Sequence, residues 1–392
     1  MKCYSYEYKT ISTTVNVSHF KGTSGVDEYH LTVRLSRYAD IETQLQWLLH
    51  AYQQSLESLG LGMQTVVLRR FFCSDLSNQT AALEVMPGSN PQNPDEPSVI
   101  SWICQPPMPP AKIALWAYHV KDSSGELNKV QEGTSLTLKR GELSHHWTTG
   151  VICQDAGSSY DQTRGILEKY NAFLKEKNLS LADNVIRTWF FVQNIDANYH
   201  GMVTARREFF AKHGLTPDTN FVASTGVEGT HANIAAKVTM DAYSISSVSP
   251  EQITFLKALD HLSPTYIYGI TFERGTSVAY RDRKHVIISG TASIDHRGEI
   301  LYPGSLSRQL DRTIENVEVL LHRAGAALNN MCMFIVYVRD PSDSCLVQQQ
   351  MRERFGDAPI QVLLAKVCRP GWLVEIEGIA IISESNLKFP EF

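Results

Sequence analysis

The chain has 392 residues, of which 43% are hydrophobic and 20% charged, and its formal net charge is −5 at pH 7. This composition is typical of a globular protein, and the length predicts two or three domains. The acidic balance argues against binding to nucleic acid or to a membrane surface, and no apolar run approaches the roughly 18 residues that cross a bilayer.

The cysteines and histidines indicate neither a disulfide framework nor a metal site. Seven cysteines are scattered without a Cys-x-x-Cys motif, and the first residues contain no apolar segment of a signal peptide. These features predict reduced thiols in a cytoplasmic protein. The 13 histidines show no close ligand spacing, and neither a P-loop nor a Gly-rich dinucleotide motif occurs. We therefore expect no metal and no cofactor.

One pattern occurs three times along the chain. A Gln opens a run of apolar positions at helical spacing, a strand-like apolar run follows, and an Asp closes the segment. The three copies span residues 44–75, 162–196 and 309–340, so Gln and Asp are 31 positions apart in the first and third copies and 34 in the second. Internal repetition of this kind predicts repeated structural units, with possible sites in the clefts between them.

In the first copy the pattern predicts a helix over 45–59, a strand over 66–72 and a last strand over 112–120. Its second helix is shortened by a predicted loop that is rich in turn residues: Pro87, Gly88, Pro91, Pro94 and Pro97. In the second copy the apolar stripe of the predicted helix consists of Ile166, Leu167, Tyr170, Phe173 and Leu174. Its later elements are predicted at 185–192 (strand), 202–210 (helix) and 233–243 (strand).

The third copy is the clearest. A strand from 285 enters a turn at Gly290, and a helix over 309–324 ends before Gly325, which favours a C-cap. Its later elements are predicted at 333–338 (strand), 345–355 (helix), 362–367 and 373–382 (strands). The order β-β-α-β-α-β-β predicts an α+β layer with a sheet on one side and helices on the other.

We therefore predict three units of the same α+β fold, with boundaries at 1–121, 130–245 and 262–392, of which the first is the most degenerate. The alternative is a chance similarity between generic α+β segments, which the matching lengths and the closing Asp argue against.

The motifs of the third copy, over residues 270–383, resemble the YjgF-type or Rid (reactive intermediate deaminase) superfamily, also called endoribonuclease L-PSP or RutC-like. They are Ser289-Gly290-Thr291, Gln309, Thr313, Asn316, Ala324-Gly325-Ala326, Val336-Tyr337 with Asp340, and the segment from Val374 to Ala380. The resemblance implies a chorismate-mutase-like fold and ligand sites between the subunits of a homotrimer. Three units in one chain would then form an intrachain pseudo-trimer and a monomer; a homotrimer of the chain is the alternative.

The second and third copies also resemble the chorismatase branch of this superfamily. The shared features are Ser289 to Ser293, the Arg187-Thr188-Trp189 strand with Arg206, and the segment from Cys368 to Glu375. This resemblance implies hydrolysis of a carboxylated enol ether with release of pyruvate. A hydrolytic imine or enamine deaminase and a non-catalytic metabolite-binding or chaperone-like protein are the alternatives. The net charge argues against ribonuclease activity.

Glu375 is the predicted general acid. Glu375 and Glu377 are two positions apart on one predicted strand, so both face the same side. A carboxyl in an apolar cleft has a raised pKa and can donate a proton near neutral pH. The resemblance gives Glu375 the same role, and the alternative is a structural Glu at an interface between units.

Cations for a carboxylate substrate are expected from Arg187, in an apolar strand, and Arg206, on the next helix. An ion pair with Asp183 or Asp196 is the structural alternative for either. Tyr199 could add a hydroxyl donor. Ser224 and Thr225 resemble a substrate loop of the chorismatases, although a plain strand start would look the same.

Cys368 could be catalytic if the neighbouring Arg369 lowered its pKa, or could form a wall that determines the product; an inert buried thiol is equally common. Gln361 is the last candidate for substrate binding. It stands where the Rid imine deaminases carry an Arg that pairs with the substrate carboxylate, which argues against simple deamination.

Overall fold

The computed structural model describes residues 1–85, 97–154 and 157–392. Three six-stranded mixed sheets form, one after another along the chain, and each has the same strand order. The predicted α+β units are therefore present, and each has one more strand before its first helix than predicted. The extra strands lie at sheet edges, where only one side is paired, and the last of them has just three residues, Ile253–Phe255. The boundaries 1–121, 130–245 and 262–392 stay a prediction.

The sheet of the first unit has the order β1-β2-β3-β6-β4-β5. Its strands are β1 (Lys2–Tyr8), β2 (Thr13–Phe20), β3 (Val26–Leu35), β4 (Val66–Cys73), β5 (Val99–Cys104) and β6 (Ile113–Asp122). Its helices are α1 (Ile41–Leu59) and α2 (Leu76–Glu84). Most of the predicted proline-rich loop, including Pro87, Pro91 and Pro94, lies outside the described residues.

The second and third units repeat this order. The second unit contains β7 (Asn128–Glu132), β8 (Ser135–Arg140), β9 (Leu143–Val151), α3 (Ser159–Glu176), α4 (Leu181–Asn184), β10 (Val185–Val192), α5 (Ile195–Lys212), β11 (Ala223–Glu228) and β12 (Val238–Ser246). The third unit contains β13 (Ile253–Phe255), β14 (Gly275–Ala279), β15 (Arg283–Ala292), α6 (Leu306–Arg323), β16 (Met331–Val338), α7 (Ser344–Phe355), β17 (Ile360–Leu364) and β18 (Val374–Ser383).

The repeated Gln has the same structural role in all three units. Gln44, Gln162 and Gln309 are almost fully buried. In each unit the amide Nε2 donates to a backbone carbonyl of the loop before the last strand, and Oε1 accepts from a backbone N–H of the same region, at 2.7–3.1 Å. A side chain with both a donor and an acceptor is needed for this contact, which explains why the repeat contains Gln.

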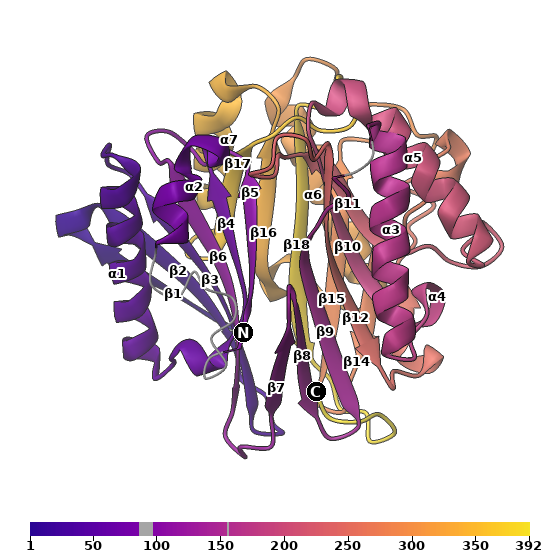
Figure 1. The fold of residues 1–392 in the computed structure, drawn as a ribbon, viewed down its shortest axis with the longest axis horizontal. Helices are drawn as coiled ribbons and strands as arrows, with labels where there is room; N and C mark the ends of the chain where they lie inside the picture. The colour runs from indigo at the N-terminus through magenta and orange to yellow at the C-terminus, as the bar shows by residue number, and fades with distance from the viewer. Residues whose placement is uncertain (86–96, 155–156) are drawn as a thin grey trace.

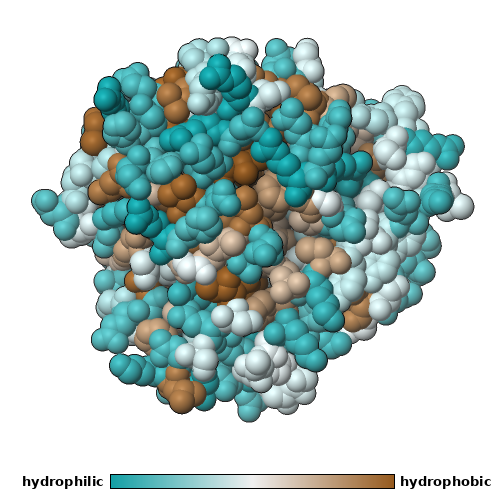
Figure 2. All heavy atoms as spheres, turned by 180° about the vertical axis from the view of Figure 1, so that it is seen from behind, coloured by the Kyte–Doolittle hydropathy of each residue, from teal (hydrophilic) through white to brown (hydrophobic). Residues whose placement is uncertain are grey.

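The sheets stand side by side around a common interior, and the helices cover their outer faces (Figure 1). The units join head to tail. At the first junction β5 meets β9 of the second unit, at the second junction β11 meets β15 of the third unit, and at the third junction β17 meets β3 of the first unit. Three equivalent junctions make an intrachain pseudo-trimer. The face turned away from the viewer in Figure 1 is largely hydrophilic, with hydrophobic side chains gathered around a hollow (Figure 2).

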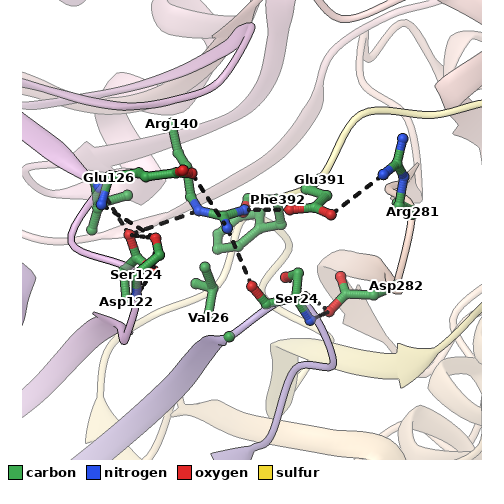
Figure 3. Close-up of polar contacts among 12 residues, drawn as sticks. Ser24, Val26, Asp122, Ser124, Glu126, Arg140, Arg281, Asp282, Glu391 and Phe392 are labelled. Atoms are coloured by element: carbon green, nitrogen blue, oxygen red, sulfur yellow. Dashed lines mark hydrogen bonds and ion pairs between the residues drawn. The ribbon is translucent and has the colours of Figure 1, made fainter.

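All three units meet at one polar cluster (Figure 3). Arg140 on β8 donates to the Ser24 carbonyl of the first unit and to the Phe392 carbonyl of the last segment, at 3.2 and 3.1 Å. The Glu391 carboxylate accepts from Arg140 at 3.0 Å. The ring of Phe392 is buried and packs against His145, and the Arg283 guanidinium lies over it. This cluster fixes the units relative to one another.

None of the helices in the described part of the chain has the length and apolar character needed to cross a bilayer.

Candidate active site

A cavity lies at the second junction, between the second and third units. With its open mouth it encloses about 530 Å³. The second unit contributes α5 and β11, and the third unit contributes the segment before β14, the end of β15, the loop between β17 and β18, and the start of β18. The lining residues are Tyr199, Arg206, Ser224, Gly226, Ile270, Phe272, Arg274, Gly290, Ala292, Ile294, Cys368, Arg369, Trp372 and Glu375.

Glu375 is the acid of this cavity. It lies near the start of β18, where it is opposite Ala292 of β15 and Tyr337 of β16. Its carboxyl lies directly over Gly290, because a Cβ added to that glycine would be 2.0 Å from Oε1 of Glu375. No hydrogen bond from the described residues reaches the carboxyl. Burial and the neighbouring Glu377 raise the pKa of Glu375 to about 8, so the acid is protonated at neutral pH.

Glu377 has a different environment, although its side chain emerges on the same face of β18. Its carboxylate forms a buried ion pair with Arg187 at 2.5 Å. It also accepts hydrogen bonds from Trp189 Nε1 and the Tyr337 hydroxyl, both at 3.0 Å, and from the Thr225 hydroxyl. These donors hold the carboxylate of Glu377 in one position. It therefore supplies a fixed negative charge behind Glu375.

Arg206 is the cation on the second-unit side of the cavity. It projects from α5, is 2% exposed, and donates to the Ser224 hydroxyl at 3.3 Å. Burial lowers the pKa of its guanidinium. Its Nε has no hydrogen-bond partner among the described residues. An incoming carboxylate would relieve the cost of this buried charge.

Arg274 is the cation on the third-unit side. It lies just before β14 and donates to the Ser263 carbonyl at 3.0 Å. Its charge partly opposes the rise in the pKa of Glu375, and both side chains line the cavity. The cavity thus holds one protonated acid and guanidiniums from both units.

Tyr199 and Cys368 both lie in the wall of the cavity. A catalytic Cys368 would need a lowered pKa. Burial and the nearby Glu375 raise the pKa of the thiol to about 12. The guanidinium of Arg369 instead lies over the ring of Trp372 and donates to the Gly298 carbonyl. Cys368 is therefore a neutral thiol, which fits a wall and not a thiolate nucleophile.

Two of the predicted binding residues lie just behind the cavity. Arg187 donates to Glu377, Thr225 and, at 2.9 Å, to the Ser289 hydroxyl, and it is not part of the lining. The Thr225 hydroxyl donates to Glu377 and accepts from the backbone N–H of Gly290 at 2.8 Å, so Thr225 links these two residues. Neither alternative partner of Arg187, Asp183 or Asp196, is bonded to it. Gln361 is not at this junction; it lines a cavity at the third junction.

Comparisons with known proteins match this architecture. Residues 275–382 match the family model described as endoribonuclease L-PSP. A RutC family protein from Pyrococcus abyssi is 29% identical over 106 residues, which are 26% of this chain and 84% of that protein. The predicted resemblance to the Rid superfamily is confirmed.

Two further relatives extend the Rid similarity beyond one unit. A 3-hydroxybenzoate synthase from Streptomyces hygroscopicus is 28% identical over 221 residues, which cover 50% of this chain and 64% of that protein. The crystal structure of a chorismatase has a TM-score of 0.61, covers 81% of this chain and 93% of that one, and is 17% identical. This second likeness shows that the three-unit fold is shared with a chorismatase.

Sequence reasoning missed the segment before β14. The segment lines the cavity with Ile270, Phe272 and Arg274. Its apolar residues have neither helical nor strand spacing, so no element is predicted there. A weak signal exists, because Glu273 and Arg274 interrupt an otherwise uncharged stretch directly before a strand. Glu273 accepts from the Phe221 backbone N–H at 3.0 Å, which joins this segment to the second unit and aims Arg274 at the junction.

Proposed function

We propose that this protein is a chorismatase-like hydrolase that cleaves a carboxylated enol ether and releases pyruvate. The observation that carries the proposal is the Glu375 carboxyl, which is protonated at neutral pH and faces the same cavity as Arg206. A proton donor beside a carboxylate-binding cation is the pair of groups that hydrolysis of a carboxylated enol ether needs. The chorismatase and the 3-hydroxybenzoate synthase to which the chain is similar support the same assignment.

In the proposed reaction Arg206 and Arg274 bind the carboxylates of the substrate. Glu375 protonates the terminal methylene carbon of the enol ether, which forms a C–H bond and leaves positive charge at the ether carbon. Water adds its oxygen to that carbon and returns a proton to Glu375. The hemiketal then breaks its C–O bond, its hydroxyl proton passes to the departing oxygen, and pyruvate and an alcohol are released.

The remaining groups of the cavity have positioning roles in this proposal. Burial and the charge of Glu377 keep Glu375 protonated until the substrate arrives, and the charge of Glu377 stabilises the cation that forms on protonation. Cys368 and Tyr199 form the wall beside the ring of the substrate. Such a wall would decide whether the ring leaves as a dihydrodiol or loses water to become a hydroxybenzoate.

The test is to incubate the purified protein with chorismate and to follow pyruvate with lactate dehydrogenase. We expect pyruvate from the wild type and a rate lower by about 10²–10⁴-fold in Glu375→Gln, which keeps the shape but cannot donate the proton. Glu176→Gln on the exposed end of α3 is the matched control and should retain the wild-type rate. If wild-type protein forms no pyruvate, the proposed reaction is wrong.

A further inference from the structure

A second cavity lies at the third junction, between the third and first units. The elements that line it correspond one by one to those of the candidate active site. β2 and β3 replace β14 and β15, the loop between β5 and β6 replaces the loop between β17 and β18, β6 replaces β18, and α7 and β17 replace α5 and β11. Its lining residues are Thr14, Arg34, Leu35, Ser36, Pro107, Met108, Pro109, Pro110, Ala111, Ala114, Gln348, Arg352, Gln361 and Val362.

The position of the acid is occupied by an alanine. Glu375 is opposite Tyr337 in the pairing of β18 with β16, and Ala114 is opposite Phe72 in the equivalent pairing of β6 with β4. β4 and β16 each have a register shift next to their first residue. Phe72 and Tyr337 each lie six residues after that first residue, so the two pairings are equivalent. A cavity of the same construction therefore persists without a proton donor at this place.

The cavity has guanidiniums from both of its units. Arg34 projects from the end of β3, and Arg352 from α7. Among the described residues, those that line the cavity include no Asp or Glu. Arg34 donates to the Asn16 side chain at 2.9 Å, while its buried Nε has no partner in the described part of the chain. Burial and the charge of Arg352 lower the pKa of Arg34 to about 10, which leaves it charged at neutral pH.

The rest of the lining offers a neutral polar edge and an apolar wall. Gln361 is 2% exposed, and its Oε1 has no hydrogen-bond partner among the described residues. The wall opposite consists of Pro107, Met108, Pro109, Pro110 and Leu35. Two like charges without a counter-charge favour an anion between them, and the wall favours an apolar body next to that anion.

We propose that the cavity at the third junction is a second, non-catalytic binding site for a small carboxylate with an apolar ring. Arg34 and Arg352 bind the carboxylate, Gln361 accepts a hydrogen bond from a hydroxyl of the ligand, and the proline-rich wall contacts the ring. This assignment does not depend on the proposed function, because it involves neither Glu375 nor turnover.

The test is calorimetric titration with benzoate, carried out in the Arg206→Met variant so that the candidate active site has lost one of its two carboxylate-binding cations. We expect benzoate to bind, and Arg352→Gln added to this background to weaken binding about tenfold or more, the usual scale for loss of a charge-assisted hydrogen bond. Arg352 is exposed, so the substitution should not disturb folding, and a thermal melt without ligand checks this. Arg37→Gln, an exposed arginine outside the cavity, is the matched control and should leave binding unchanged.

Inorganic phosphate is the second probe. It can use both guanidiniums but not the apolar wall, so we expect it to bind more weakly than benzoate. Three results would overturn the proposal: no benzoate binding in the Arg206→Met background, equal weakening by Arg37→Gln and Arg352→Gln, or phosphate binding as tightly as benzoate. None of these results bears on pyruvate release, so failure here is distinct from failure of the proposed function.

Discussion

Glu375 and Glu377 are two residues apart on the same face of β18, but only Glu377 is paired with a cation. Glu377 forms a buried ion pair with Arg187, whereas burial and the neighbouring charge of Glu377 raise the pKa of Glu375 to about 8. Of these two identical side chains, Glu375 is therefore the one that can donate a proton at neutral pH. The activity and stability of variants should depend on this difference between the two carboxyl groups and on the junctions between units.

The rate of pyruvate release should depend on the protonation of Glu375. A group whose pKa is raised to about 8 is protonated below that pH and loses its proton above it. A general acid is active only while protonated, so the wild-type rate should fall as the pH rises through about 8. Glu375→Gln should show a low rate with no such fall. A pH–rate profile of both proteins from pH 6 to 9.5 is the measurement, and an unchanged fall in the Gln variant would assign the titration to another group.

Gly290→Ala should abolish most activity while the chain still folds. The added Cβ would be 2.0 Å from Oε1 of Glu375, so the carboxyl must move away from the cavity. The end of a Glu side chain can rotate at modest cost, because the strand itself need not shift. We expect pyruvate release to drop by about 10²-fold or more, the scale of a lost general acid, with little change in thermal unfolding. Retention of the wild-type rate would show that the position of this carboxyl is not critical.

Arg206→Met and Arg187→Met should have different effects. Arg206 lines the cavity without an ion pair to a described carboxylate, so its loss should raise KM about tenfold or more and leave stability nearly unchanged. Arg187 is paired with Glu377, and its loss leaves a buried charge, which typically costs about 3–5 kcal/mol. Steady-state kinetics and urea unfolding of both variants separate the two roles. Equal stability of the two variants would contradict the assignment of Arg187 to a structural pair.

The first junction should be held by a buried ion pair. Arg70 on β4 and Asp241 on β12 are 2.8 Å apart and at most 2% exposed, and Asp241 also accepts from the Ser101 hydroxyl and the Gly150 backbone N–H. Either Arg70→Met or Asp241→Asn should cost about 3–5 kcal/mol, and the double variant should lose less than the sum. Urea unfolding of the four proteins in the cycle measures this. Additive losses would show that the two residues are not coupled.

The particle should be a monomer. Each unit already has both neighbours within the chain, as each subunit has in a closed trimer, so no partner is needed to cover the sheets. We expect a mass near 44 kDa, that of one chain, from light scattering behind a size-exclusion column. A mass near three chains would instead indicate a homotrimer.

Much of the fold could be predicted because its causes are local. The period of the apolar residues locates α6 and β10 to within a few residues, and the repeated Gln marks a contact that each unit makes within itself. Glu375 could be predicted as an acid because an ionisable group inside an apolar strand is itself the signal. The short edge strands could not, since β13 has only three residues and no alternating pattern.

The partners of the site residues could not be predicted because they lie across junctions. Arg187 and Glu377 are 190 positions apart in the sequence. No local pattern distinguishes an arginine in this ion pair from one that is available to bind a substrate carboxylate. Arg274 lies in an irregular segment whose direction depends on the second unit. The junction at which Gln361 lies could not be predicted either, since only the closed ring of units shows that β17 belongs to a different junction from the start of β18.

The ring of units in one chain has a consequence for how the three junctions can change. In a symmetric homotrimer one substitution alters all three interfaces at once. Here each junction is encoded by different codons. The position of Glu375 and Ala114 is held in the second unit by Thr239, which is opposite Phe191 in the pairing of β12 with β10. One junction can therefore gain an acid, a second can hold the buried ion pair of Arg70 and Asp241, and a third can keep a cationic cavity. The presence of all three units in one chain thus allows three copies of one interface to differ in sequence while the ring remains closed.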